Sequence, residues 1–285
     1  MSATISEQTA RLTLVVETDA HEGPVYAADE HALYFTTVRT NRVAIKRLDL
    51  DSGTVSVVRR DANTANGMAL DRGGRLVVCE QGTLTEPARI TRLDRRTGAM
   101  ETVVDSFEGA PLNSPNDVVV KRDGTIWFTD PSYGHLQGFR PEPRLGDHVY
   151  RYDPASDSLT VAAEGFDKPN GLAFSPDERV LYLGDNGAPK ALLAFDVGED
   201  GNLAGRRVLA TSAGDHPDGI KTDSEGRIYA SAPGGIDILA PSGERLDRIE
   251  LPGAVIFTFG GRDRNVLYIT ADTAIWAAVL DAKGV

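Results

Sequence analysis

Five oxygen-bearing side chains recur at corresponding points of a segment that repeats along the 285-residue chain. They are two carboxylates and three amides: Glu22, Asn66, Asn116, Asn170 and Asp218. Such groups facing one channel would repel one another or stay unsatisfied, because burying a charge without a partner costs free energy. A hard divalent cation resolves this, and we expect Ca²⁺ first, since it accepts about six to eight oxygen ligands. Zn²⁺, Mn²⁺, Mg²⁺ and Fe²⁺ stay open as alternatives.

The elements that position these residues are predicted to be short strands. Each repeat contains an apolar or alternating run, a polar turn and a second run rich in β-branched and aromatic residues, which are typical of strands. The second runs span 32–38, 75–80, 125–130, 180–185, 227–232 and 266–271. The repeats start at Glu22, Asn66, Asn116, Asn170, Asp218 and Ile256. A period of about 40 to 50 residues with little helix predicts an all-β fold, a six-bladed β-propeller in which these starting residues face the central channel.

The two ends of the chain are predicted to complete one blade together. The run 11–17 precedes the first repeat and the run 274–280 follows the last, so pairing them would close the ring and remove an open sheet edge. No linker divides the chain, which favours a single domain over residues 1–285. The Gly- and Pro-rich stretch 131–148 interrupts the repeat as a long loop, where a substrate lid could lie.

The composition excludes several classes of partner and site. There are 42 Asp and Glu residues against 30 Lys and Arg, a net charge of −12, and the pI is about 4.9. This balance argues against nucleic acid and anionic membranes as partners. The single cysteine, Cys79, allows no internal disulfide and no thiolate metal cluster, and we expect it to be packed in the core. Without a signal-like segment or a long apolar stretch, the chain is expected to be cytoplasmic, and its oligomeric state is left open.

Several candidate residues also have a purely structural interpretation. An Asn-Gly pair is usually a hairpin turn, and for Asn66 the structural and functional interpretations are equally supported. Asp218 could likewise stabilise a turn through its side chain. Asp130 follows a predicted strand, where a carboxylate either caps a turn or contacts substrate hydroxyls, and Tyr133 is a weaker candidate of the same kind. His21 lies beside Glu22, and His216 lies near Asp218; each could support its neighbour.

Several longer motifs resemble the SMP-30/gluconolactonase family, in the same order and over nearly the whole chain. The motifs are EGPVY at 22–26, SPNDVVVKRDGTIWFTDPSYG at 114–134, KPNGLAFSPD at 168–177, HPDGIKTDSEGRIYAS at 216–231 and FGGRDRNVLYIT at 259–270. The resemblance implies a six-bladed propeller that holds one divalent ion and hydrolyses sugar lactones. It also implies that Glu22, Asn170 and Asp218 are metal ligands, with Asn116 as a fourth ligand or a substrate contact.

The chain departs from the family pattern at four positions. Tyr26 stands where members often have Trp, and Thr37 stands where Asp is frequent. Ile256 replaces an Asn that is common at the sixth ring position, so one wall of the cavity is expected to be more apolar. Ser114 replaces an Arg that holds a sugar hydroxyl in some lactonases. The resemblance implies a polyhydroxy substrate such as gluconolactone.

The mechanism is expected to combine the ion with one carboxylate. A bound cation can polarise a lactone carbonyl, and Asp218 is the candidate general base for the attacking water. Direct attack by Asp218, or by a hydroxide held at the ion, stays open. Asn66, Asn116, Asp130 and Tyr133 are the candidate substrate contacts. The alternatives to a lactonase are phosphoester or phosphofluoridate hydrolysis at the same site, and a non-enzymatic propeller that binds a partner on its face.

Overall fold

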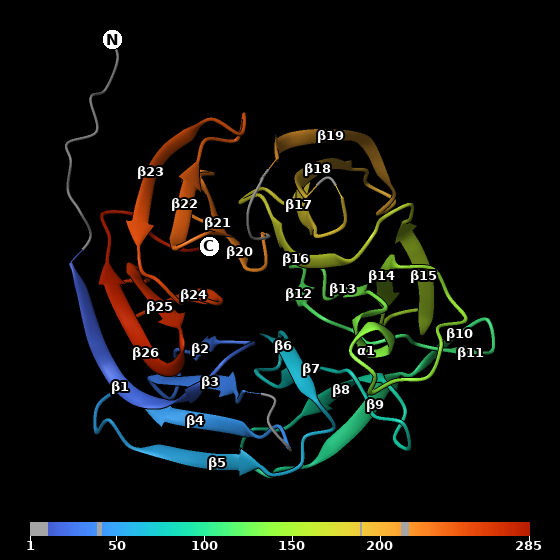
Figure 1. Ribbon diagram of the computed structural model, residues 1–285, viewed down its shortest axis with the longest axis horizontal. Helices are drawn as coiled ribbons and strands as arrows, with labels where there is room; N and C mark the ends of the chain where they lie inside the picture. Colours follow the sequence, from blue (N-terminus) through green and yellow to red (C-terminus); the bar gives the residue numbers. More distant parts are fainter. Residues whose placement is uncertain (1–10, 39–41, 189, 212–216) are drawn as a thin grey trace.

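Six four-stranded antiparallel sheets are arranged radially around a central channel in the computed structural model (Figure 1). The structure describes residues 11–38, 42–188, 190–211 and 217–285. This arrangement is a six-bladed β-propeller, so the all-β fold predicted from the repeat is confirmed. The single domain over residues 1–285 stays a prediction.

Each blade runs from an inner strand at the channel to an outer strand at the rim (Figure 1). The inner strands are β2 (Val25–Ala27), β6 (Ala65–Leu70), β12 (Val118–Val120), β16 (Pro169–Phe174), β20 (Ile220–Thr222) and β24 (Phe257–Gly260). The second strands are β3 (Ala32–Thr36), β7 (Leu76–Glu80), β13 (Ile126–Asp130), β17 (Val180–Asp185), β21 (Ile228–Ala232) and β25 (Val266–Thr270). The second strands coincide with the six predicted runs to within two residues, which confirms that part of the prediction.

The outer half of each blade is more exposed. The third strands are β4 (Ile45–Asp49), β8 (Arg89–Leu93), β14 (His148–Asp153), β18 (Ala191–Val197), β22 (Gly235–Leu239) and β26 (Asp272–Val279). The outer strands are β5 (Val55–Arg59), β9 (Met100–Val104), β15 (Ser158–Ala163), β19 (Leu203–Thr211), β23 (Arg245–Glu250) and β1 (Leu12–Ala20). A separate hairpin pairs β10 (Ser106–Phe107) with β11 (Ala110–Pro111).

The last blade joins the two ends of the described chain. β1 pairs with β26 in antiparallel register from Leu12 opposite Ala278 to Ala20 opposite Asp272. The sheet order is β1-β26-β25-β24, so the first strand in the sequence supplies the outer edge of the last blade. The predicted closure is therefore confirmed, and it fixes the ring because each blade now has a neighbour on both sides.

The turn between the inner and second strands is built by the same chemistry in different blades. In the second blade, one carboxylate oxygen of Asp71 accepts hydrogen bonds from the backbone N–H groups of Gly73 and Arg75, at 2.8 and 2.9 Å. Gly74 has a φ of 76°, which a glycine adopts without strain. Asp223 repeats this pattern in the fifth blade. These turns send every second strand back from the same face of the ring.

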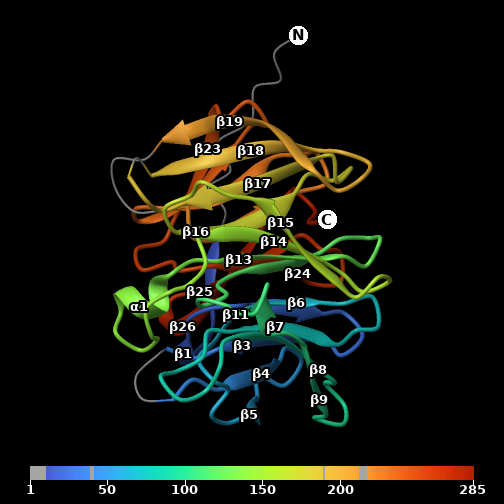
Figure 2. The ribbon, with the colours of Figure 1, turned by 90° about the vertical axis from the view of Figure 1, so that its right-hand side faces the viewer.

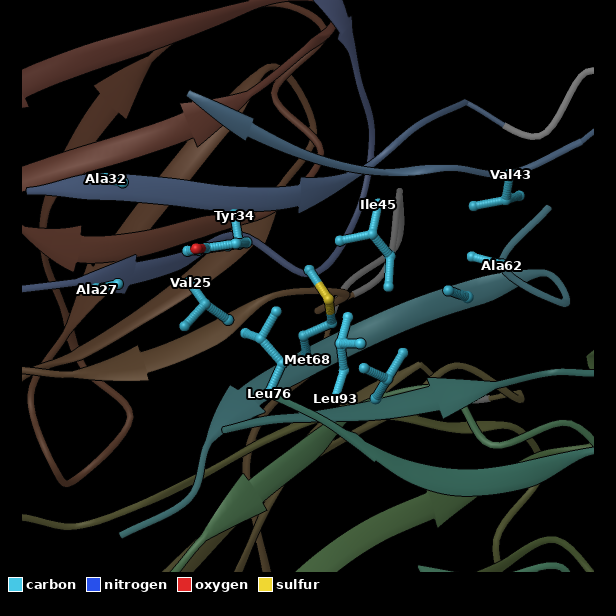
Figure 3. Packing of buried hydrophobic residues seen from close by; sticks show 12 residues of the cluster. Val25, Ala27, Ala32, Tyr34, Val43, Ile45, Ala62, Met68, Leu76 and Leu93 are labelled. Carbon is cyan, nitrogen blue, oxygen red and sulfur yellow. The ribbon is translucent and has the colours of Figure 1, made fainter. Parts of the chain in front are cut away.

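The blades are held together by apolar side chains packed between neighbouring sheets. Figure 3 shows the cluster between the first and second blades, where Val25, Tyr34 and Ile45 lie against Met68 and Leu76. All five side chains are buried. Truncating one such side chain, Leu76→Ala for example, is expected to cost about 2–5 kcal/mol. The second strands are buried over nearly their whole length, so they act as a rigid support for the inner strands.

The segment 131–148 contains a short helix, α1 (Tyr133–Leu136), that lies at one of the two faces of the ring (Figure 2, left). This is the only helix among the described residues, and it is too short to cross a lipid bilayer. The cytoplasmic location stays a prediction. Cys79 is fully buried, as expected, and burial raises the pKa of its thiol.

Candidate metal and substrate site

The residues predicted to form a ring lie where the inner strands begin. Asn66 and Asn170 are the second residues of β6 and β16, and the other predicted members precede their strands by one to three residues. Backbone hydrogen bonds to the second strands hold them in place. The carbonyl of Glu22 accepts from the N–H of Thr36 at 2.8 Å, and the N–H of Asn116 donates to the carbonyl of Thr129 at 2.8 Å.

The Asn-Gly pairs are contact points between neighbouring inner strands and lie outside the hairpin turns. A Cβ atom on Gly67 would lie 2.5 Å from the carbonyl oxygen of Asn116 in the next blade. A Cβ atom on Gly171 would lie 1.8 Å from the carbonyl oxygen of Asp218. Real atoms never approach so closely, so only glycine allows the ring to close at this radius. The glycines thereby bring the side chains that precede them close to the axis.

These side chains line one cavity of about 300 Å³ at the end of the channel where the inner strands begin. The five polar ring members all line it, together with Tyr133 and His21. Its remaining lining residues are Thr37, Val43, Thr64, Ala65, Gln81, Gln137 and Asn186. None of the lining residues that the structure describes is a lysine or an arginine. The structure therefore brings together Glu22, Asn66, Asn116, Asn170, Asp218 and Tyr133, and these predicted site residues share one polar cavity.

The two carboxylates of the cavity are poorly solvated. Burial raises the pKa of Glu22 well above its usual range, and the negative charges of Asp218 and Asp117 raise it further. Burial also raises the pKa of Asp218 to about 6, while His21 and a hydrogen bond from Asn170 lower it. The negative charges of Glu22 and Asp218 repel each other, and a bound cation would stabilise both carboxylates in their charged form.

The amides supply further oxygen atoms that lack partners. The side-chain oxygens of Asn66 and Asn170 are buried and accept no hydrogen bond within the described ranges. Unsatisfied buried oxygens are uncommon, and they suit a ligand that accepts electron pairs. The described residues contain no group of three or more His, Cys, Asp or Glu that could hold a metal. The five polar ring members supply two carboxylates and three neutral amides. Such a mixture of oxygen ligands fits a hard cation.

Tyr133 enters the cavity from helix α1. Its hydroxyl oxygen accepts a hydrogen bond from Nδ2 of Asn186 at 3.0 Å. Burial raises the pKa of Tyr133 to about 12, so the phenol stays protonated near neutral pH. Its own proton is then available to an oxygen atom in the cavity. The segment 131–148 thus contributes to the cavity wall through Tyr133 and Gln137.

Asp130 does not line this cavity. Its two carboxylate oxygens accept hydrogen bonds from the backbone N–H groups of Asn113 and Ser114, each at 2.8 Å. Burial raises the pKa of Asp130 to about 7, and the two backbone donors oppose that shift. The buried Arg140 donates to the carbonyl of Asn113 in the same loop. The geometry thus favours the turn-capping interpretation of Asp130, which supports the loop beneath Tyr133.

Three lining residues that the sequence interpretation did not place there share one position. Thr37, Gln81 and Asn186 each directly follow a second strand. For Gln81 and Asn186 the signal was present, because the position after a predicted second run (75–80 or 180–185) lies at the same end of the blade as the start of the inner strand, whereas Thr37 lay inside the predicted run 32–38. His21 also lines the cavity, and its Nδ1 lies 2.7 Å from Oδ1 of Asp272. His216 is outside the described residues.

The departures from the family pattern lie in different places. Ile256 is buried but does not line the cavity, so the expected apolar wall at that position was wrong. Ser114 is also buried, and its hydroxyl donates to the carbonyl of Pro131 at 2.5 Å. Thr37 does line the cavity. Tyr26 lies outside it and lines a second cavity, where its ring stacks on Tyr268 at a centroid distance of 6.2 Å.

The fold and the cavity define a class: six-bladed propellers with an oxygen-lined site at one end of the channel. A model of the SMP-30/gluconolactonase/LRE-like region matches residues 20–273. The chain belongs to this family, which confirms the resemblance seen in the motifs.

Relatives with names and structures are similar over most of the chain. A gluconolactonase of Zymomonas mobilis is 31% identical over 253 residues, 80% of this chain and 68% of that protein. The pentonolactonase XacC of Haloferax volcanii is 28% identical over 269 residues, 91% of this chain and 84% of that protein. The structure of XC5397 from Xanthomonas campestris, a gluconolactonase, has a TM-score of 0.85 and 36% identity, covering 95% of this chain and 90% of that one.

Proposed function

We propose that this chain is a metal-dependent lactonase that opens a small lactone, with a sugar lactone such as gluconolactone as the substrate. The observation that carries the proposal is the convergence of two buried carboxylates and unpartnered amide oxygens on one polar cavity. The named relatives are gluconolactonases and a pentonolactonase, which supports the same class of substrate. The polar lining suits a ligand that carries several hydroxyl groups.

The cation is held by Glu22, Asn170 and Asp218, with Asn116 as a fourth ligand or a substrate contact. Ca²⁺ is the proposed ion, because the donors are all oxygens and include neutral amides. When bound, it supplies a positive charge that polarises the lactone carbonyl and stabilises the developing oxyanion. Glu22 and Asp218 provide the two negative charges that make the cavity selective for cations over anions.

Asp218 accepts a proton from the water whose oxygen bonds to the carbonyl carbon of the lactone, and it returns that proton to the ring oxygen when the bond between the carbonyl carbon and the ring oxygen breaks. Burial raises the pKa of Asp218 to about 6 in the metal-free protein, and a bound cation would lower it again, so the role of Asp218 as the base rests on its place in the cavity and not on its proton affinity. The hydrogen bond from Asn170 orients this carboxylate. The hydroxyl of Tyr133 donates a hydrogen bond to a substrate oxygen, while Asn186 holds the phenol in place. Asn66 offers an amide to a second hydroxyl of the substrate.

The test is hydrolysis of gluconolactone by the full chain before and after removal of metal with EDTA. We expect turnover to disappear with EDTA and to return with Ca²⁺, and calorimetry to detect one Ca²⁺ site that Glu22→Gln abolishes. A fluorophosphonate is assayed in parallel, because faster turnover of that compound would favour the phosphofluoridate alternative.

Two results would overturn the proposal. One is gluconolactone hydrolysis that EDTA does not affect, which would remove the cation from the reaction. The other is the absence of turnover on a panel of aldonolactones by protein that binds Ca²⁺, which would favour a non-enzymatic propeller. Asp263→Asn, at an exposed carboxylate in the turn of the last blade, is the control for substitution of an aspartate as such.

A further inference from the structure

A second and larger cavity lies at the opposite end of the inner strands. Its volume is about 910 Å³. Its walls come from two sources. In the first, second and last blades they come from the turn that connects the inner strand to the second strand, and in the second blade also from the turn between β8 and β9. Because the first cavity is lined by the starts of the inner strands, these turns lie on the other face of the ring. Nothing in the proposed lactonase reaction uses this second cavity.

The charge of this cavity is opposite to that of the whole protein. Six arginines and only two aspartates line it, a surplus of four positive charges in a chain with a net charge of −12. The arginines are Arg72, Arg75, Arg95, Arg96, Arg262 and Arg264. Asp71 and Glu101 pair with Arg75, and Asp29 and Glu30 pair with Arg95, so the positive charge that an anion would meet comes mainly from the remaining arginines. We name these six residues and their hollow the arginine cavity.

Two of the six guanidinium groups are available to a ligand. Arg72 and Arg96 form no ion pair with any residue in the part of the chain that the structure describes, and both are exposed. Arg262 lies 3.7 Å from Asp51, with both side chains at least 70% exposed, so solvent weakens that pair. Arg95 differs, because Asp29 at 2.9 Å and Glu30 already bind it. The exposed guanidinium groups of Arg72 and Arg96 are therefore the ones that a ligand can reach, whereas Arg95 is held by its acidic neighbours.

Aromatic rings complete the wall. Tyr26 and Phe259 both line the arginine cavity, and Tyr26 is fixed by stacking on Tyr268 and by a 2.8 Å hydrogen bond between its hydroxyl and Nδ1 of His31. Rings beside guanidinium groups suit a ligand that has an apolar or sugar face as well as charged groups. The cavity volume falls within the range of about 300–1,000 Å³ that is usual for small-molecule sites.

We propose that the arginine cavity binds a small organic phosphate with at least two negatively charged groups, such as a sugar bisphosphate. Guanidinium groups present paired N–H donors that match phosphate oxygens and stay charged at every physiological pH. A small anion can occupy a local positive hollow, whereas a long polyanion would also meet the negative charge that prevails over the rest of the surface. This proposal stands independently of the lactonase reaction on the other face.

The test is calorimetric titration of the full chain with fructose 1,6-bisphosphate in excess Ca²⁺, with fructose at matched ionic strength as the uncharged comparison. We expect the bisphosphate to bind and fructose to give no signal at this cavity. The double variant Arg72→Gln/Arg96→Gln should weaken binding about tenfold for each guanidinium removed, the factor expected for the loss of a charge-assisted hydrogen bond.

The matched control is Arg122→Gln. Arg122 occupies the position in the third-blade turn that Arg72 occupies in the second, but it donates to the carbonyl of Pro176 at 2.5 Å and does not line the arginine cavity. This control should leave bisphosphate affinity unchanged. Equal affinity in wild type and double variant, or no detectable binding to wild type, would overturn the proposal. The unfolding midpoint verifies that each variant folds, so failure here is distinguishable from failure of lactone hydrolysis.

Discussion

The two cavities at the ends of the channel differ in charge, burial and the kind of ligand they require. The smaller one, the carboxylate cavity, holds Glu22 and Asp218 among neutral amides, and its described lining includes no lysine or arginine. The arginine cavity has surplus positive charge at an exposed rim. Both are built from the same inner strands, so the difference comes from which residues stand at the start of the strand and which stand in the turn after it.

Burial decides how strongly each cavity depends on its ligand. Burial removes hydration from the two carboxylates and raises their pKa values, so the proposed cation would stabilise the folded protein. The exposed guanidinium groups keep much of their water, so an anion there gains less and is weakened by salt. The comparison predicts large effects at the carboxylate cavity and moderate effects at the arginine cavity.

The largest effect is expected from Asp218→Asn. Removal of the proposed base and of one ligand charge should lower kcat for gluconolactone by about 10³-fold or more. The same variant should bind fructose 1,6-bisphosphate as the wild type does, because residue 218 lines the carboxylate cavity and not the arginine cavity. The measurement is steady-state hydrolysis beside calorimetry on the same preparation. Unchanged kcat would remove Asp218 from the mechanism.

The next effect is expected from Gly171→Ala, which adds a Cβ atom 1.8 Å from the carbonyl oxygen of Asp218. The inner strands must then move apart, at a cost of about 3 kcal/mol in the free energy of unfolding. Gly73→Ala, in a turn that lines the arginine cavity, places its Cβ 3.3 Å from a side-chain oxygen and should cost less than about 0.5 kcal/mol. Denaturant unfolding measures both. Equal costs would show that the close approach of blades is not what requires Gly171.

The stabilisation by Ca²⁺ should depend on pH. In metal-free protein the folded-state pKa of Asp218, about 6, lies above that of an unfolded aspartate, so the stability contribution of this group falls as the pH rises from about 4 to 6. Ca²⁺ requires the charged carboxylates, so its stabilising effect should grow over the same window and reach about 2.7 kcal/mol at one hundred times Kd.

Unfolding in Ca²⁺ and in EDTA, at about pH 5 and about pH 7.5, measures this increment. Asp218→Asn should reduce the pH dependence of the increment, and the part that comes from Glu22 should remain. The same increment at both pH values would contradict the assignment of the buried carboxylates as ligands, because protons and the cation would then not compete for them.

The parts of the fold that follow from local patterns were predicted from sequence. The second strands, such as Val180–Asp185, are continuous apolar runs bounded by turn residues, and the runs 11–17 and 274–280 lay outside the six repeats, which left them to pair with each other. The six aligned repeats predicted the number of blades. Helix α1 was missed because four residues in a Gly- and Pro-rich segment carry no helical periodicity.

The candidate site was predicted in part. The five polar ring members share a repeat position, so their convergence follows from the circular arrangement of blades. Asp130 could not be separated from the site, because whether a carboxylate at a strand end faces a cavity or two backbone N–H groups depends on the loop opposite it. The arginine cavity also lay beyond the sequence, since Arg72, Arg96 and Arg262 become neighbours only when the last blade closes beside the first.

The smallest effect compares two tyrosines, one in each cavity. Tyr133 accepts from Asn186 and keeps its own proton for a ligand in the carboxylate cavity, whereas the hydroxyl of Tyr26 already pairs with His31 in the arginine cavity. Tyr133→Phe should raise KM for gluconolactone about tenfold, the value of one hydrogen bond to a bound ligand, with a smaller change in kcat. Tyr26→Phe should leave both constants unchanged. Equal kinetics for the two variants would mean that the Tyr133 hydroxyl only supports Asn186, and the substrate contact would then have to come from the amides of the ring.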